Sequence, residues 1–205
     1  MLENKHMEVL NNIKDGIIAT SWIEWLAVIT GVLYVLLAAK KKISCWFFAI
    51  ISSSIYVYLC ATSNLLIESF LQVFYVLMGI AGWYFWNKTK DKAELIKTWR
   101  INNHLLNIAV STIILFGIGY YFDHNTEQDY PYLDAFTTTY SIAATFMVTQ
   151  RVLENWLYWI VIDIAAVFLY AAKDFYLTAL LYLIFIILAV FGYLQWRRKY
   201  NLQRV

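Results

Sequence analysis

The sequence contains little of the residue types on which most enzymes and most soluble folds depend. Its 205 residues include one Pro, two Cys and three His, and only 15% are charged. Cys45 and Cys60 fall in one apolar segment, where a helix would hold them about 22 Å apart, too far for a disulfide. The three histidines fall outside the apolar segments, so we expect neither a metal site nor a histidine proton relay within a membrane.

Further absences exclude other classes of protein. No Lys falls inside an apolar segment, which excludes a retinal Schiff base, and there is no Gly-rich phosphate-binding loop. No nucleophile–base pair is evident, so we expect no enzymatic activity, no cofactor and no nucleic-acid partner. The polar N-terminal stretch contains no short apolar region, so we also expect no cleavable signal peptide.

Apolar residues, by contrast, are abundant. Hydrophobic residues make up 61% of the chain and aromatic residues 19%, and the mean hydropathy is +0.57. Such values are typical of a membrane protein surrounded by lipid. Apolar runs long enough to span a bilayer predict an all-α integral membrane protein with seven transmembrane helices. The predicted spans are 22–39, 44–61, 66–86, 105–122, 132–149, 155–172 and 175–196.

The distribution of basic residues predicts the orientation of these spans. Thirteen Lys and Arg residues, including the KKK at 40–42 and those of the C-terminal tail, fall on one side of the membrane and three on the other. The positive-inside rule places the richer side in the cytoplasm. We therefore expect the N-terminus outside and the C-terminus inside.

An internal repeat is also visible. A shift of 110 residues aligns 22–88 with 132–198 without a gap, so that Trp46 meets Trp156 and the Gly and Trp of GWYFW meet those of GYLQW. The ends of the apolar segments coincide at the same shift. The sequence therefore predicts a parallel 3+1+3 repeat, with 105–122 as the linker helix. Parallel repeats are typical of transporters that bind substrate near the midplane, between the two copies.

Several polar residues lie inside the predicted spans. Asp163 lies near mid-span, where a carboxylate costs roughly 2.5–3.5 kcal/mol on insertion scales. Helical spacing places it on one face with Asn155 and Trp159, and it places Gln72 with Tyr75 on one face of the third span. Aromatic faces with one carboxylate suit an organic cation, through cation–π attraction and ion pairing. We expect Asp163 to face a water-filled substrate path.

Other interpretations of these residues stay open. Aromatic residues at helical spacing more often pack or anchor a helix at the membrane interface, and we expect that role of Trp83, Trp86 and Trp196. Asp163 would otherwise make a structural hydrogen bond, either to the serines of the second span or to Tyr140.

Three stretches resemble the PnuC family of bacterial vitamin transporters: SWIEWLAVITGVLYVLLAAKKKISCWFFAIIS (21–52), ESFLQVFYVLMGIAGWYFW (68–86) and ENWLYWIVIDIAAVFLYAAKDFYLTALLYLIFIILAVFGYLQWRR (154–198). The resemblance covers most of the chain. It implies a 3+1+3 fold similar to the SWEET sugar carriers, in a homotrimer in the bacterial inner membrane. It also implies facilitated diffusion of nicotinamide riboside, a small cationic vitamin that a cytoplasmic kinase traps by phosphorylation.

The resemblance also implies roles for individual residues. It assigns substrate contact to Gln72, Tyr75, Asn155, Trp159, Asp163 and Tyr182. Gate or secondary roles are expected of Glu68, Trp46, Trp156 and Tyr140.

Three alternatives to nicotinamide riboside transport remain. Similar members of the family carry thiamine, riboflavin or deoxynucleosides, and some nicotinamide riboside members have an amide where this chain has Asp163. Thiamine is therefore the alternative within the family, and riboflavin, larger and uncharged, fits less well. A sugar carrier of the SWEET type and a seven-helix receptor or scaffold are the alternatives outside it.

Overall fold

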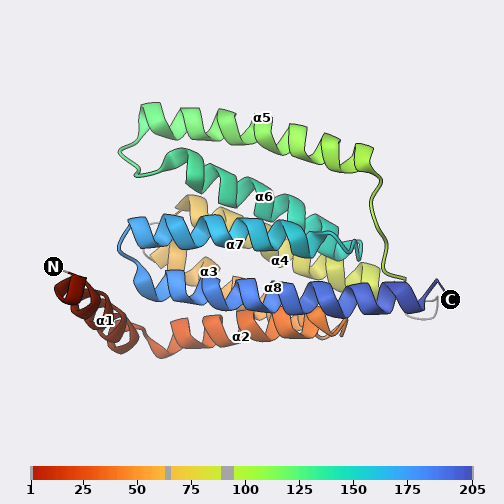
Figure 1. Ribbon diagram of the computed structural model, residues 1–205, viewed down its shortest axis with the longest axis horizontal. Coiled ribbons are helices and arrows are strands. Elements are labelled where there is room, and N and C mark those ends of the chain that lie inside the picture. The colour runs from red at the N-terminus through yellow and green to blue at the C-terminus, as the bar shows by residue number, and fades with distance from the viewer. Residues whose placement is uncertain (1, 63–65, 89–94, 205) are drawn as a thin grey trace.

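The computed structural model describes residues 2–62, 66–88 and 95–204, which form eight α-helices (Figure 1). Their bounds are α1 Leu2–Ala19, α2 Trp22–Ala39, α3 Cys45–Thr62, α4 Leu66–Lys88, α5 Ile101–Asn125, α6 Pro131–Thr149, α7 Asn155–Ala172 and α8 Tyr176–Leu202. Helices occupy all seven ranges that the apolar runs predict, so the all-α fold class is confirmed.

Helix α1 is the element that the apolar pattern does not predict. It packs against α8, and a Cβ added at Gly16 would lie 3.4 Å from the Leu177 side chain. Val9, Ile13 and Gly16 are partly buried, while Met7 is exposed. Steps of four and three residues place the three buried positions on one face. The helix is therefore held by a narrow stripe, which is too short a pattern to stand out in a polar segment.

Six helices form a closed ring. Going around it, α2 packs on α3, α3 on α4, α4 on α6, α6 on α7, α7 on α8, and α8 on α2. Among the described residues, helices on opposite sides of the ring, such as α4 and α7, do not pack on each other. Buried side chains that approach one another across the ring therefore lie in its interior.

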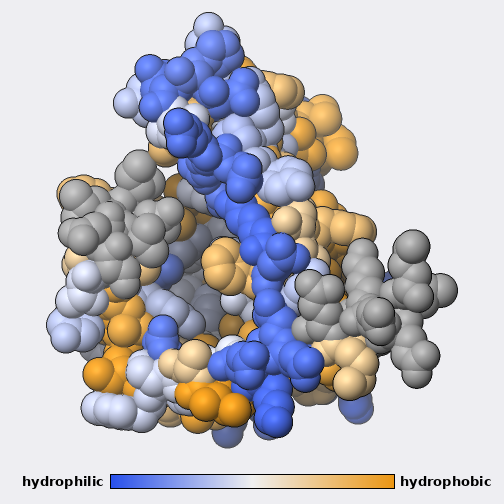
Figure 2. All heavy atoms as spheres, turned by 90° about the vertical axis from the view of Figure 1, so that its left-hand side faces the viewer, coloured by the Kyte–Doolittle hydropathy of each residue, from blue (hydrophilic) through white to orange (hydrophobic). Residues whose placement is uncertain are grey.

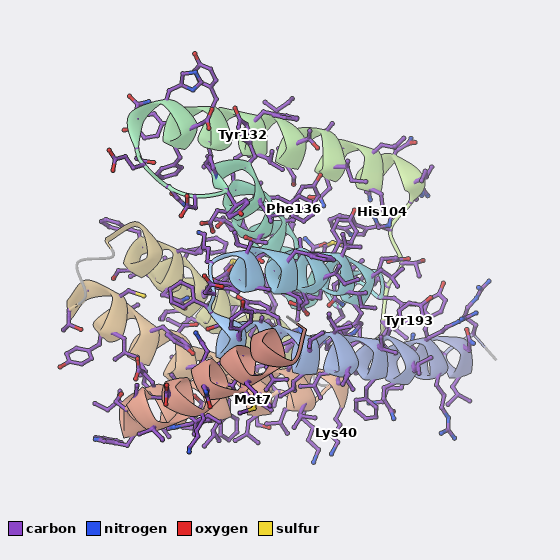
Figure 3. The ribbon with its side chains drawn as sticks, turned by 60° about the vertical axis from the view of Figure 1, so that its left-hand side comes forward. Met7, Lys40, His104, Tyr132, Phe136 and Tyr193 are labelled. Carbon is purple, nitrogen blue, oxygen red and sulfur yellow. The ribbon has the colours of Figure 1, made fainter. Side chains whose placement is uncertain are left out.

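Helix α5 lies outside this ring. It packs against α6, and the two helices diverge toward the N-terminal end of α5 (Figure 1). Figure 3 shows Tyr132 and Phe136 of α6 and His104 of α5 spread along this side of the bundle. Two hydrogen bonds join α5 to the ring, one to α6 and one to α7. Thr112 and Tyr140 share a hydrogen bond of 3.0 Å, and His104 Nδ1 lies 3.0 Å from the Tyr158 hydroxyl of α7.

Six of the described helices are long and apolar enough to cross a membrane: α2, α3, α4, α5, α7 and α8. Helix α6, expected as the fifth span, falls short because it carries the polar run Thr137–Thr138–Thr139 and several further hydroxyl residues. Its neighbours explain the composition. It lies between α4, α5 and α7, so much of its surface contacts protein. The count of seven spans is therefore not confirmed.

The ends of α2 and α6 are built in the same way. Each ends in a left-handed residue that is not glycine, with φ 60° at Lys41 and 57° at Arg151. At α2, Lys41 N–H donates to Ala38 and Lys42 N–H donates to Leu37, which is the Schellman pattern of helix termination. The same pair of bonds follows α6. The reversal turns the chain sharply, so that the next helix runs back beside the last.

Candidate functional site

The interior of the six-helix ring holds a carboxylate among tyrosines. Asp163 of α7 is 3% exposed, and it makes no hydrogen bond or ion pair with the described residues. Tyr182 of α8 lies within electrostatic range of both Asp163 and Tyr75 of α4. The ring thus brings together three of the predicted site residues, two from the consecutive helices α7 and α8 and one from the distant helix α4.

Aromatic rings form the surroundings of this carboxylate. The rings of Tyr170 and Tyr182 stack with centroids 5.3 Å apart and an interplanar angle of 11°. Phe185 meets Tyr182 edge-on at 5.9 Å. On the facing side, Tyr75 of α4 lies beside the Ser141 side chain of α6. These contacts hold the tyrosines in place before any ligand arrives.

The chemistry of this site suits a positively charged ligand. A buried carboxylate without a partner is costly, and a cation placed beside it would offset that cost. Aromatic faces attract cations as well, most strongly where water is excluded. The described residues contain no group of three His, Cys, Asp or Glu side chains that could hold a metal ion. A small, flat organic cation is the ligand that these groups fit best.

Asn155 and Trp159 lie nearer to the C-terminal end of α8 than Asp163 does. Eight residues of helix separate Asn155 from Asp163, which is about 12 Å. Asn155 is fully buried; its Nδ2 donates to the Val152 carbonyl at 2.5 Å, while its Oδ1 has no partner among the described residues. Trp159 is half-buried beside the hydrophobic core. These two residues therefore lie toward the tryptophan end of α7 and not beside the carboxylate.

The remaining predicted residues are spread more widely. Gln72 is half-buried one turn from Tyr75 and makes no hydrogen bond to the described residues. The Tyr140 hydroxyl is paired with Thr112 of α5. No ion pair or hydrogen bond joins it to Asp163 in the described part of the chain. The side chain of Glu68 lies outside the described residues.

The serines opposite Asp163 are also occupied. Ser52 donates a hydrogen bond of 2.8 Å to the Ala27 carbonyl of α2, so it joins α3 to α2. Ser53 is buried as well. Among the described residues, no hydrogen bond joins Asp163 to either serine, which leaves the carboxylate without the structural partner considered from the sequence.

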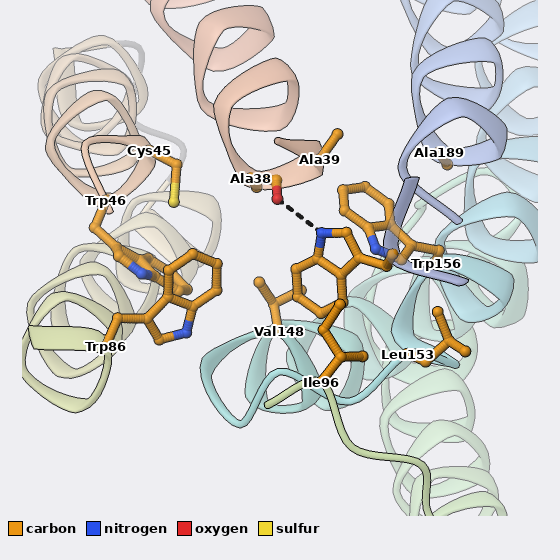
Figure 4. Packing of buried hydrophobic residues seen from close by; sticks show 11 residues of the cluster. Ala38, Ala39, Cys45, Trp46, Trp86, Ile96, Val148, Leu153, Trp156 and Ala189 are labelled. Carbon is orange, nitrogen blue, oxygen red and sulfur yellow. Dashed lines mark hydrogen bonds between the residues drawn. The ribbon is translucent and has the colours of Figure 1, made fainter. Parts of the chain in front are cut away.

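Four tryptophans form a buried cluster at one end of the ring (Figure 4). They are Trp46, Trp86, Trp156 and Trp196, each at most 3% exposed. The expectation that Trp86 and Trp196 anchor helices at the lipid interface is therefore wrong. Their indole N–H groups explain the difference, because each finds a backbone carbonyl inside the protein, Thr149 for Trp86 and Ala38 for Trp196. Trp83, by contrast, is 49% exposed, as an interface residue would be.

Three residues of this region are not among the predicted site residues. Tyr170 stacks on Tyr182, Ser141 lies beside Tyr75, and Arg151 lies over the Trp86 ring at 4.8 Å from its centroid. Tyr170 falls on the same helical stripe as Asp163, which could have indicated it. Arg151 is aligned with Lys41 by the 110-residue shift, yet nothing in that alignment predicts burial against an indole.

Comparison with known proteins identifies relatives along nearly the whole chain. A family model described as nicotinamide mononucleotide transporter matches residues 21–198. The nicotinamide riboside transporter PnuC of Escherichia coli is 26% identical over 203 residues, covering 86% of this chain and 85% of that protein. The nicotinamide riboside transporter PnuC of Neisseria mucosa is 30% identical over 199 residues, covering 87% of this chain and 73% of that protein.

A solved structure agrees with these matches. The crystal structure of the vitamin B3 transporter PnuC superposes with a TM-score of 0.72 at 27% identity, covering 94% of this chain and 90% of that chain. Six long apolar helices and this likeness describe a multi-pass membrane protein. Because the family model spans residues 21–198, the chain belongs to the nicotinamide mononucleotide transporter family, the family of the PnuC vitamin transporters.

Proposed function

We propose that this protein carries nicotinamide riboside across the bacterial inner membrane by facilitated diffusion. The observation that supports this most directly is Asp163, a carboxylate that is 3% exposed and has no partner among the described residues. The pyridinium ring of nicotinamide riboside carries a fixed positive charge and is flat. It would offset the buried carboxylate and stack on the neighbouring tyrosines.

Individual contacts follow from where the polar groups lie. Tyr75 and Tyr182 would stack on the ring, and the amide of Gln72, which makes no hydrogen bond to the described residues, would bind a ribose or carboxamide group. Asn155 Oδ1 is buried without a partner in the described residues. It would accept a hydrogen bond from substrate on the way between the site and the tryptophan cluster.

Seven spans in a 3+1+3 arrangement similar to the SWEET carriers form part of the proposal. The support is that contacts recur at the 110-residue shift. The Trp46 and Trp86 rings meet at 5.4 Å and 87°, and the Trp156 and Trp196 rings meet at 5.6 Å and 85°. An odd number of spans places the two termini on opposite sides of the membrane. The positive-inside rule puts the side with thirteen Lys and Arg residues in the cytoplasm, so the C-terminus would lie there and the N-terminus outside the cell.

Net uptake would then depend on chemistry in the cytoplasm. A passive carrier equalises concentrations, so accumulation requires a kinase that converts the vitamin into a phosphate ester which the site does not carry. We propose such a kinase as a functional partner, and a homotrimer as the assembly in the membrane. Detergent-solubilised protein measured by light scattering would test the assembly, and a monomeric mass would contradict it.

Thiamine is the second candidate, and Asp163 is the observation that favours it. Thiamine also carries a fixed positive charge in a flat ring. Some nicotinamide riboside transporters of the family have an amide at the position where this chain has the Asp163 carboxylate. The Asp163 carboxylate would therefore stabilise either vitamin in the same way. Riboflavin is uncharged and gains nothing from the carboxylate.

The test is direct binding to purified protein by titration calorimetry, with nicotinamide riboside, thiamine and riboflavin compared side by side. We expect the first to bind most tightly. We also expect Asp163→Asn to weaken binding of the cationic vitamin by about 10- to 100-fold, because hydrogen bonds and ion contacts to a charged group contribute more than neutral ones.

A matched variant controls for the loss of a carboxylate elsewhere. Asp174→Asn makes the same chemical change at the exposed turn before α8, where Asp174 accepts a hydrogen bond of 2.8 Å from the Tyr176 hydroxyl. This variant should bind the vitamin like the parent protein. If only thiamine bound, thiamine and not nicotinamide riboside would be the substrate. Competition by glucose, with no effect of Asp163→Asn, would favour a sugar carrier.

A further inference from the structure

The tryptophan cluster closes one end of the six-helix ring. Its rings form a continuous chain, from Trp46 on α3 to Trp86 on α4, then to Trp196 on α8 and to Trp156 on α7. Four helices from opposite sides of the ring thus meet through indole contacts. Figure 4 shows Trp46 and Trp86 on one side and Trp156 on the other, with Val148 and Ile96 between them.

Within each half of the chain, one tryptophan is seated directly on a helix backbone. A Cβ added at Gly82 would come 2.4 Å from the Trp46 ring, and one added at Gly192 would come 2.7 Å from the Trp156 ring. No side chain fits between ring and helix at either place. The Trp46 ring is therefore packed directly on the α4 backbone, and the Trp156 ring on the α8 backbone.

Between the halves, one ring contact and several hydrogen bonds join the cluster. The rings of Trp86 and Trp196 touch at 6.1 Å. The Trp86 indole donates to the Thr149 carbonyl at 3.1 Å, and the Trp196 indole donates to the Ala38 carbonyl at 3.0 Å. Arg151 adds a third bond, from Nη2 to the Trp86 carbonyl at 3.1 Å.

A short extended segment, residues 95–99, covers this end of the ring. Ile96 is 3% exposed and belongs to the same buried cluster. Gln203 binds both polar groups of its backbone, accepting from Ile96 N–H at 2.9 Å and donating to Ile96 O at 3.3 Å. Lys97 pairs with the loop after α6, since its N–H donates to Arg151 and its carbonyl accepts from Leu153. We call residues 95–99 the latch segment.

The opposite end of the bundle differs. Figure 2 looks onto the end where α1 lies, and it shows a recess beside a band of hydrophilic side chains. One end of the ring is therefore hollowed, while the other is filled by indole rings and covered by the latch segment.

From these contacts we infer that the tryptophan cluster is a gate that closes the transport path at the end rich in basic residues, next to Lys41 and Arg151. We infer also that the latch segment holds this gate shut. Opening separates Trp86 from Trp196 and breaks the bonds between the halves, while Trp46 and Trp156 stay on their glycine seats. Release of Ile96 from Gln203 uncovers the cluster. The inference rests on the proposed transport function, because a gate requires a path.

Cys45 provides a reporter that needs no vitamin. It is fully buried in the cluster, next to Trp46, and lies within electrostatic range of Arg151. The second cysteine, Cys60, is replaced by Ser to leave one thiol. The experiment measures the rate at which a hydrophilic maleimide labels Cys45 in C60S protein held in lipid nanodiscs, for the parent and for Gln203→Ala and Ile96→Ala.

We expect both variants to raise the labelling rate of Cys45 by roughly tenfold or more. Gln203→Ala removes two hydrogen bonds that hold the closed state, and Ile96→Ala keeps those bonds but removes a buried apolar side chain. Gln128→Ala is the matched control. It removes a glutamine bonded to Asp134 at the other end of the molecule, and its labelling rate should equal that of the parent. Melting curves of all variants identify any that have simply unfolded.

Two outcomes would overturn the gate. One is an unchanged Cys45 rate in both latch variants, and the other is an equal rise in the Gln128→Ala control, which would mean general loosening. Failure of the proposed function has a different signature. Faster labelling in the latch variants, together with no binding of any vitamin, would support the gate and contradict the proposed transport of a vitamin.

Discussion

At the scale of single residues, Lys41 and Arg151 show one backbone conformation kept for different reasons. Both are left-handed, with φ 60° and 57°, although a side chain in that region costs about 1–2 kcal/mol. Arg151 uses the turn to reach Trp86, whose ring and carbonyl it contacts. A glycine there would relieve the backbone and lose both contacts.

Lys41 lets the backbone cost be measured on its own. We expect Lys41→Gly to be more stable than Lys41→Ala by about 1 kcal/mol, because both remove the side chain and only Gly adopts positive φ without strain. Thermal unfolding in detergent measures the difference. The control is Lys40, where φ is −78°, and Lys40→Gly should be less stable than Lys40→Ala. An equal melting temperature for the two Lys41 variants would contradict the idea.

At the scale of helices, two glycines set how closely α3 approaches α4 and how closely α7 approaches α8. We expect Gly82→Ala and Gly192→Ala each to destabilise the protein by about 1–3 kcal/mol, because the added methyl meets an indole ring that has no room to move. Thermal unfolding measures this as well.

Gly117 is the control for these two substitutions. It lies in α5 with no atom within 4 Å of an added Cβ, so Gly117→Ala should leave stability unchanged or raise it by up to about 1 kcal/mol, as replacement of an interior helix glycine does. If all three variants melted alike, the glycine seats would have no special role.

At the scale of the whole molecule, a ring that is hollowed at one end and closed at the other fits a carrier that exposes its site to one side at a time. In proteoliposomes without a kinase, we expect labelled nicotinamide riboside to enter only until the inner and outer concentrations are equal. With a nucleoside kinase and ATP enclosed, accumulation should continue, because phosphorylation removes the free vitamin.

Two results would contradict this expectation. Accumulation without the kinase, driven by a sodium or proton gradient, would indicate ion coupling rather than facilitated diffusion. No entry under any condition, with binding intact, would favour a receptor or scaffold. Empty liposomes processed in the same way provide the background.

Much of the fold could be predicted because membrane helices are strongly marked in a sequence. Long apolar runs predict α2 and α7 to the residue, and the remaining expected ranges agree with helices to within a few residues. Helix α1 was missed because its packing stripe is short, and α6 is less apolar than a lipid-facing span because other helices cover it. Both depend on neighbours that a local pattern does not contain.

The candidate site could be predicted in part for the same reason. Helical periodicity indicates that Asp163, Tyr75 and Tyr182 face inward, but only the ring of helices brings them within range of one another. The assignment of Trp86 and Trp196 to the interface was wrong because an indole fits any apolar environment that offers one hydrogen-bond acceptor to its N–H group. Buried carbonyls at Thr149 and Ala38 supply that acceptor inside the protein.

The sequence by itself therefore determined the seven apolar helices, the polar face of several of them, and that one carboxylate lies at mid-span, since these properties follow from local composition and from the period of the helix. Only the tertiary structure decided that Asp163 has no partner among the described residues and that the tryptophans close one end of the ring. Partners come from residues distant in the chain, and the packing of eight helices determines which of them meet.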